Sequence, residues 1–458
     1  MAERRLSGSG WWRRDLPWRS PWLVVRALAR VFGREGLVWL DGRGGPLAGI
    51  GRLGVAPQQQ VVCRGLPGHE GARDPFTELA AMAAGGGHWM GWLAYEAGAW
   101  VESSHHWKPP TMASLWAARH DPVLAIDPAC QALWLEGSDG VAIEAMAALI
   151  EALPAAPTAG DTDNQAGAGW GPGPPRGLPL DHWHWHTTPA AFAEQVRRIR
   201  AWIAAGDLFQ ANLTACVEQP LPQGSDLLGI YGRLRRHCPA PFAGLAIAGG
   251  GAAGEAVLSA SPERFLQVSA AGWVETRPIK GTRPRHSEAE ADAEAAADLI
   301  SSPKDRAENV MIVDLLRNDL GRVCTPGSVR VPQLVGLESY AQVHHLTSVV
   351  RGRLREDQGL AELLRACWPG GSISGAPKLR ACQRLDELEP LPRGPYCGSL
   401  FRLAPDGGFD SSILIRSAFV AGGTIRAHAG CGIVADSDPT LEAEELGWKL
   451  QPLLEALA

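Results

Sequence analysis

The chain has 458 residues, a net charge of −6, 45% hydrophobic residues and 20% charged residues. These values are ordinary for a globular protein of roughly two or three domains. Because no basic run is long, they argue against a nucleic-acid surface. The nine cysteines are scattered without a CxxC pair, which favours reduced thiols over a disulfide framework or a zinc site. No signal peptide or membrane span is evident, so we expect a cytoplasmic protein.

The first third of the chain is predicted to alternate strands and helices. After an extended start, strands are expected at 38–41, 61–63, 89–95, 123–126 and 132–135, and helices at 22–32, 77–84 and 140–153. Fourteen of the 18 tryptophans lie before residue 190. Because indole rings commonly fill protein cores, we interpret this enrichment as packing and not as a ligand pocket.

Residues 154–180 are rich in Pro, Gly and Ala, which is typical of a linker or a long surface loop. His182, His184 and His186 follow. In a strand their three imidazoles would share one face, which is compatible with zinc. No cluster of cysteines or carboxylates accompanies them, so we do not favour a metal site there.

Clear punctuation marks the elements after residue 187. Thr188-Pro189 predicts the start of a helix that Gly206 ends. The stretch 206–214 then leads into a strand. A helix is expected at 227–238. Gly249–Gly254 matches the GxGxxG pattern, but a strand and not a helix is expected after it. We therefore read a hairpin loop and do not favour a dinucleotide-binding oxidoreductase, which stays an alternative that would need a helix to begin in these glycines.

Lys280 stands in an unusual local setting. Pro278 fixes the backbone before it, and Gly281 permits close approach after it. A lysine in such a corner suits presentation as a nucleophile. Glu263 ends the preceding strand, and a hairpin of this length would bring it near Lys280. The pair is then an ordinary ion pair or an acid/base couple.

Two predicted helices begin with similar sequences, Ser302-Pro303 and Asp438-Pro439. The first carries Asp305 and Glu308, and the second carries Glu442 and Glu445; each pair is three residues apart and shares a face. Acids in a first turn favour the helix dipole, which explains either pair alone. Together the two pairs would make an all-oxygen magnesium site.

Polar loops and strands between these helices suggest an anionic ligand. The Gly/Ser stretch 369–378 enters a helix and suits a carboxylate or phosphate. Arg416 follows an apolar run, and an arginine in that setting is expected to pair with an anion, either a structural partner or a ligand carboxylate. His345 lies in a predicted strand. These residues indicate an enzyme acting on a small carboxylated molecule, without naming the reaction.

From Pro189 to Lys449 the chain resembles the chorismate-utilising enzymes. The matching stretches are GDLFQANLT, SPERF, TRPIKGT, DRAENVMIVDLLRNDL, HHLTS, PGGSISGAPK, GPYCGSLF, ILIRSA and GCGIVADS. The resemblance implies an α+β fold, a large two-part sandwich with mostly antiparallel sheets inside and helices outside. It also implies that region 1–153 interleaves with a chorismate-binding catalytic domain at 181–458, across the linker 154–180.

Within the family, the chain is most similar to the aminodeoxychorismate synthase branch, component I. Related anthranilate synthases usually have alanine where Lys280 stands, and the Leu-Leu-Glu-Ser stretch that they use for feedback is missing here. The implied reaction converts chorismate and ammonia to 4-amino-4-deoxychorismate in para-aminobenzoate and folate biosynthesis. Anthranilate synthase, isochorismate synthase and a catalytically silent chorismate-binding subunit are the alternatives. The intact Glu263 and Lys280 argue against the last.

The resemblance also implies a role for each matching residue. Lys280 would be the nucleophile and Glu263 the general acid/base, while Glu308 and Glu445 would hold Mg²⁺ with Asp305 and Glu442 beside them. Contacts to substrate are implied for Gly281, Thr282, His345, Ser372, Tyr396, Arg416 and Gly432. No cysteine lies in a Gly-x-Cys-x-Gly context, so a separate glutamine amidotransferase subunit is expected to supply ammonia.

Overall fold

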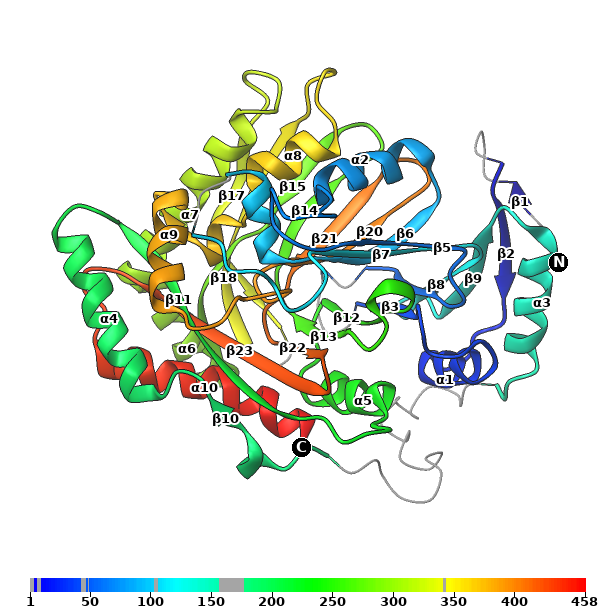
Figure 1. The fold of residues 1–458 in the computed structure, drawn as a ribbon, viewed down its shortest axis with the longest axis horizontal. Coiled ribbons are helices and arrows are strands. Elements are labelled where there is room, and N and C mark those ends of the chain that lie inside the picture. Colours follow the sequence, from blue (N-terminus) through cyan, green and yellow to red (C-terminus); the bar gives the residue numbers. More distant parts are fainter. Residues whose placement is uncertain are drawn as a thin grey trace.

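The computed structural model describes residues 4–5, 10–42, 47, 49–102, 106–155, 177–340 and 343–458. Two large antiparallel β-sheets occupy its centre, and helices cover them from outside (Figure 1). Side chains from both sheets, such as Val257 and Phe401, belong to one buried apolar cluster. The predicted α+β sandwich is therefore confirmed.

The larger sheet has 13 strands, each paired antiparallel with its neighbours. In spatial order they are β1 (Arg4–Arg5), β2 (Trp12–Leu16), β9 (Ala132–Gly137), β8 (Val123–Asp127), β4 (Gly51–Gly54), β3 (Val38–Asp41), β12 (Phe242–Ile247), β13 (Ala256–Ser261), β22 (Ser417–Ala421), β23 (Thr424–Ile433), β11 (Gln210–Pro220) and β10 (His184–Trp185), with β19 (Gly375–Ala376) beside β11.

The second sheet has ten strands. They are β16 (Ile279–Pro284), β18 (Val343–Arg353), β15 (Trp273–Thr276), β14 (Arg264–Val268), β21 (Phe409–Ile413), β20 (Ser399–Leu403), β6 (His88–Leu93), β7 (Leu115–His120) and β5 (Gln59–Cys63), with β17 (Arg330–Ser339) beside β18.

Each sheet combines early and late parts of the chain. The early strands of the larger sheet join the later ones where β3 pairs with β12, and those of the smaller sheet join where β6 pairs with β20. Domain limits at 1–153 and 181–458 stay a prediction. Residues 156–176 of the predicted linker lie outside the described residues.

The helices pack on the outer faces of the sheets (Figure 1). They are α1 (Pro21–Phe32), α2 (Pro75–Gly85), α3 (Gly140–Glu151), α4 (Pro189–Ala204), α5 (Leu227–His237), α6 (Ala289–Ser301), α7 (Pro303–Gly321), α8 (Leu360–Cys367), α9 (Lys378–Leu388) and α10 (Pro439–Leu457), with short 3₁₀ turns η1 (Tyr95–Trp100), η3 (Leu180–His182), η4 (Gly250–Ala252) and η5 (Gly371–Ile373).

The helix α4 shows how local sequence sets an element. The Thr188 hydroxyl accepts a hydrogen bond from the Ala191 amide at 3.2 Å, and proline occupies the first turn. Phe192, Val196 and Ile199 recur at helical spacing and are fully buried, which removes their apolar surface from water. The predicted helix start is therefore confirmed.

Tryptophans of the first third pack in the core, as predicted. Trp92 and Trp116 stack with ring centroids 4.9 Å apart, and Trp39 is fully buried beside Trp22. His182, His184 and His186 do not lie together in one strand, because β10 contains only His184–Trp185 and His182 ends η3. His186 instead pairs with Glu218 at 3.1 Å.

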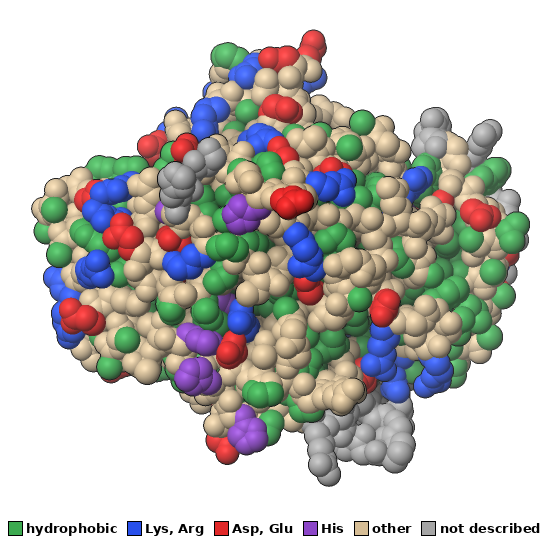
Figure 2. All heavy atoms as spheres, in the orientation of Figure 1, with side chains coloured by type: hydrophobic (Ala, Val, Ile, Leu, Met, Phe, Trp, Pro, Cys, Tyr) green, Lys and Arg blue, Asp and Glu red, His purple; other side chains and the backbone are tan. Residues whose placement is uncertain are grey.

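Two further expectations concern excluded functions. β12 and β13 form an antiparallel hairpin around η4, so the glycines at 249–254 do not open the helix that a dinucleotide site requires. In Figure 2, basic and acidic side chains are interspersed on the visible face. Within the described residues, no helix is long and apolar enough to cross a membrane.

Candidate active site

The candidate acids are carried by two helices whose starts are fixed in the same way. The Ser302 hydroxyl caps α7 by accepting a hydrogen bond from the Asp305 amide at 3.3 Å. The Asp438 carboxylate caps α10 by accepting from the amides two and three residues further on. Each helix has proline in its first turn. These caps fix the first turns from which the acids project.

Lys280, on β16, contacts one carboxyl group and is within electrostatic reach of a second. Its Nζ donates to Oε1 of Glu308 at 2.7 Å. Burial acts to raise the pKa of Glu308, but the charges of Lys280, Lys449 and Lys304 outweigh it, and the pKa is lowered. The structure also brings Glu263 close enough to Lys280 for that charge to act on it. The amine therefore forms an ion pair with Glu308 and acts on Glu263 through its charge.

Glu263 differs from Glu308 in its ionisation. It is buried, and burial raises its pKa to about 7, against the opposing effects of the Ser372 hydroxyl and the Lys280 charge. Ser372 Oγ donates to Glu263 Oε1 at 2.7 Å. A carboxyl group whose pKa lies near neutrality can both give and take a proton at physiological pH.

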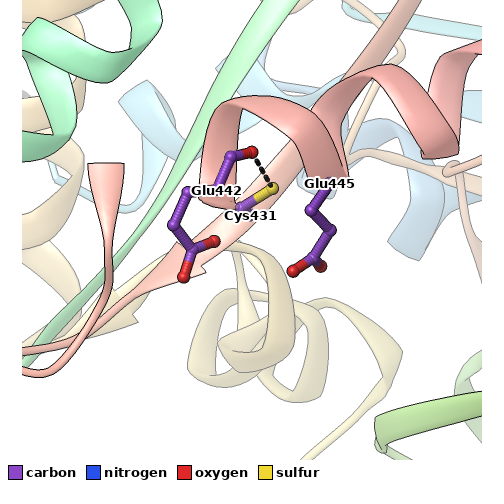
Figure 3. A group of neighbouring side chains, drawn as sticks. All are labelled: Cys431, Glu442 and Glu445. Carbon is purple, nitrogen blue, oxygen red and sulfur yellow. Dashed lines mark hydrogen bonds between the residues drawn. The ribbon is translucent and has the colours of Figure 1, made fainter. Parts of the chain in front are cut away.

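The acids of α10 extend toward the same side, with Cys431 of β23 between them (Figure 3). One ligand atom from each of Cys431, Glu442 and Glu445 lies within 4.8 Å of the others. Burial raises the pKa of Cys431 to about 12, so this residue keeps its proton. The carboxylates are therefore the donors that a hard cation would use.

Two lysines connect these acids with Glu308. Lys304 lies 3.5 Å from Glu442 Oε1, and Lys449 Nζ donates to Glu445 Oε1 at 2.7 Å. The charges of both lysines also act on Glu308. Three carboxylates from α7 and α10 therefore share one electrostatic environment, which the lysines balance.

Asp305 lies slightly apart from this group. Its Oδ2 is 3.4 Å from Arg283 Nη2. A Cβ added to Gly281 would lie 2.9 Å from the Asp305 Cβ, and Gly281 has φ +82°, a conformation that favours glycine. Asp305 therefore packs on β16 next to the lysine.

A cavity of about 320 Å³ opens beside these residues, lined among others by His345, Arg416, Trp448 and Lys449. The guanidinium of Arg416 makes no ion pair or hydrogen bond within the described residues. Arg416 is exposed to solvent, yet the protein atoms packed around it lower its pKa through desolvation. A larger cavity of about 930 Å³ lies elsewhere and contains none of the candidate residues. An unpaired guanidinium in a concave site suits a carboxylate ligand.

His345 is a neutral group in this cavity. It is buried, and burial followed by the charge of Arg416 lowers its pKa to about 3. Its Nδ1 lies 2.8 Å from the Thr282 hydroxyl, in the register that pairs β16 with β18. The imidazole can therefore orient a ligand by hydrogen bonding without adding charge.

Tyr396 and Gly432 complete the predicted set. Tyr396 stacks on His428 with ring centroids 4.8 Å apart and planes 15° apart, and burial raises its pKa, so the phenol keeps its proton. A Cβ added to Gly432 would lie 2.6 Å from both Glu308 Oε1 and Gln210 Nε2. Glycine is therefore required there for close approach of the two side chains.

The chain matches one protein family over most of its length. A model of the chorismate binding enzyme family matches residues 50–455. The chain belongs to that family. The match includes all the candidate acids, Lys280 and the residues that line the cavity with Arg416.

Relatives within the family carry two different names. Aminodeoxychorismate synthase component 1 of Salmonella typhimurium is 44% identical over 275 residues, 60% of this chain and 59% of that protein. Anthranilate synthase component 1 of Streptomyces coelicolor is 45% identical over 285 residues, 61% of this chain and 54% of that protein. The matches therefore span less than two thirds of either relative.

A solved structure shows the same fold over most of the chain. The crystal structure of anthranilate synthase component I from Streptococcus pneumoniae TIGR4 is 27% identical, with a TM-score of 0.72. The match covers 88% of this chain and 92% of that chain.

The donors present fit a divalent cation of the magnesium type. Glu308, Glu442 and Glu445 offer carboxylate oxygens, the type of donor that hard cations prefer. Lys304 and Lys449 offset negative charge on these carboxylates. The nearby sulfur is protonated, so it offers no competing thiolate.

Sequence reasoning missed three polar residues of the site: Gln210, Lys304 and Lys449. Lys449 stands four residues after Glu445 in a predicted helix, and this spacing alone indicated an ion pair. Gln210 lies in the matching stretch GDLFQANLT but was given no role. Its Nε2 donates to Glu308 Oε1 at 2.7 Å across 98 positions of sequence.

Proposed function

We propose that the chain is component I of aminodeoxychorismate synthase and converts chorismate and ammonia to 4-amino-4-deoxychorismate. The observation that carries this proposal is the position of Lys280. Its Nζ lies 2.7 Å from Glu308 Oε1, and its charge acts to lower the pKa of Glu263. Related anthranilate synthases usually have alanine at this position. The Salmonella typhimurium relative with the corresponding name supports the same reading.

Lys280 would act as a nucleophile after losing its proton and leaving Glu308. Its Nζ would form a bond to ring carbon 2 of chorismate while the bond between carbon 4 and its hydroxyl breaks. Ammonia would then add at carbon 4, and the bond from carbon 2 to Nζ would break, returning the electron pair and a proton to the lysine. The net change consumes ammonia and releases water, and the lysine is regenerated.

Glu263 would supply and accept the protons in these steps. With a pKa of about 7, a large fraction is protonated at neutral pH. The acid can protonate the departing hydroxyl, which leaves as water, and the resulting carboxylate can take a proton from the incoming ammonia.

Substrate carboxylates would bind to the positive and hydrogen-bonding groups around the cavity. Arg416 and Lys449 supply charge, and His345 supplies a neutral imidazole. Further contacts are proposed for Gly281, Thr282, Ser372, Tyr396 and Gly432. These groups would hold the ring with carbon 2 facing Lys280.

We further propose that Glu308 and Glu445 hold Mg²⁺, with Asp305 and Glu442 beside them. When bound, Mg²⁺ acts as a Lewis acid on the ring carboxylate. Glu442 stays fixed through its hydrogen bond from Ser437 Oγ at 2.7 Å.

Ammonia would come from a glutamine amidotransferase subunit in the cytoplasm. The name "component 1" of the relative supports a partner, and none of the nine cysteines has the Gly-x-Cys-x-Gly context of such an enzyme. All nine cysteines are free, in keeping with a reducing compartment.

The products formed from chorismate test this proposal. The purified chain is incubated with chorismate, Mg²⁺ and an ammonium salt, and the products are separated by chromatography. We expect 4-amino-4-deoxychorismate, which an added lyase converts to para-aminobenzoate. Anthranilate as the main product would overturn the proposal and favour the second candidate, an anthranilate synthase, which the Streptomyces coelicolor relative supports.

A further inference from the structure

Gln210 is buried at the centre of the candidate site but has no role in the proposed chemistry so far. It is the first residue of β11 and is only 1% exposed. Its Nε2 donates to Oε1 of Glu308 at 2.7 Å, and the same oxygen accepts from Lys280 Nζ at 2.7 Å. Glu308 therefore has two donors on one oxygen atom.

The backbone around Gln210 is built for this contact. β19 pairs with β11 at Gln210↔Ala376, and β23 pairs with it at Asn212↔Gly432. A Cβ at Gly432 would lie 2.6 Å from both Gln210 Nε2 and Glu308 Oε1. The contact therefore depends on three strands and on one glycine that leaves space for it.

The two donors differ in what the reaction requires of them. Lys280 must leave Glu308 before it can attack carbon 2, so its hydrogen bond is temporary. Gln210 has no such task, and its amide donor is always available. After the lysine leaves, the amide is the remaining side-chain donor that this structure shows on Glu308.

We propose that Gln210 is a positioning residue that holds Glu308 in the orientation in which it binds Mg²⁺. The inference rests on the proposed magnesium site. Hydrogen bonds to ligating carboxylates typically contribute a factor of roughly 10 to 100 in metal affinity. Pinning Oε1 leaves Oε2 of Glu308 without a hydrogen bond from any described side chain.

The test measures metal affinity directly. Full-length chains are titrated with Mn²⁺ without chorismate, and free Mn²⁺ is followed by electron paramagnetic resonance. Gln210→Leu removes the amide donor at similar volume. We expect it to weaken Mn²⁺ binding about 10- to 100-fold. We also expect kcat with ammonium salt to recover at saturating Mg²⁺, which a general loss of structure would not allow.

Matched controls separate the possible outcomes. Gln219→Leu changes a second buried glutamine of the same strand, 2% exposed, whose Nε2 has no hydrogen-bond partner within the described residues. It should bind Mn²⁺ like the wild type. Unchanged affinity in Gln210→Leu would overturn this inference while leaving the magnesium site intact. Unchanged affinity in Glu308→Gln would overturn the magnesium site, and this inference with it.

Discussion

Glu263 and Lys280 act on each other electrostatically, but their surroundings differ. The carboxyl of Glu263 is buried and has a pKa of about 7, whereas the Lys280 side chain is 12% exposed and holds an ion pair with Glu308. Glu263 can therefore transfer protons near neutral pH, and the ion pair with Glu308 fixes the position of the Lys280 amine.

The pKa of Glu263 predicts a pH dependence. Because this pKa is raised, the protonated acid is lost as pH increases through about 7. We expect kcat/KM, measured with excess ammonia, to decrease above that pH. Glu263→Gln should lower kcat roughly 10²- to 10⁴-fold and remove this limb of the profile. A variant that keeps both the rate and the limb would exclude Glu263 as the acid.

Single residues of the site were predictable where the signal was local. Lys280 stood out between Pro278 and Gly281, and the acids of α7 and α10 followed visible caps. Gln210 did not stand out, because its contact with Glu308 joins positions 98 residues apart. A glutamine at the start of a strand carries no local mark of such a contact.

At the level of elements, β23 must approach α7 closely. Gly432→Ala would place a methyl group 2.6 Å from Glu308 Oε1 and Gln210 Nε2, so one of the two must move. Since misplacement by about 1 Å of a catalytic group costs on the order of 10²-fold, we expect a similar loss in kcat/KM, measured with chorismate and ammonium salt.

Gly447 of α10 provides the control for this change. A Cβ there meets nothing within 4 Å. Gly447→Ala should keep activity and stabilise the helix by up to about 1 kcal/mol, measured by urea denaturation. Equal activity of the two alanine variants would show that the approach of β23 to Glu308 is unimportant.

Element boundaries were largely predictable. Three helices, α4, α7 and α10, begin where Thr188, Ser302 and Asp438 precede proline. The signal for such a start is local, because the capping side chain bonds to an amide within the next three residues. The extent of β10 could not be read from the alternating residues at 182–186, because a short edge strand depends on its pairing with β11.

For the whole molecule, distant parts of the chain share one fold, and this could not be derived from local patterns. The pairs β3–β12 and β6–β20 join early strands to late ones, and the resemblance to a known family supplied that architecture. Glu96 of η1 belongs to the same long-range framework. Its Oε1 accepts a hydrogen bond from the Gly394 amide at 3.1 Å, 298 positions away.

Glu96 predicts how stability depends on pH. Burial raises its pKa to about 7, against opposing hydrogen bonds and the charge of Arg393. The folded state therefore binds the proton more tightly than the unfolded state. The resulting stabilisation is complete below about pH 4.5 and is lost as pH rises through about 7. Glu96→Gln, which mimics the neutral acid, should be more stable than wild type at pH 8 by about 3 kcal/mol.

Urea denaturation at pH 5 and pH 8 checks this expectation. The difference between wild type and Glu96→Gln should be small at pH 5 and large at pH 8. A difference that does not change with pH would mean that Glu96 is ionised in the folded protein.

The covalent role of Lys280 is tested most directly by mass spectrometry. The chain is mixed with chorismate and Mg²⁺ without ammonia, quenched in acid within the first turnover and digested. We predict that the peptide carrying Lys280 gains the mass of one chorismate less one water. Lys280→Ala should show no adduct and no formation of 4-amino-4-deoxychorismate. An unmodified peptide, together with full turnover in Lys280→Ala, would contradict the lysine mechanism.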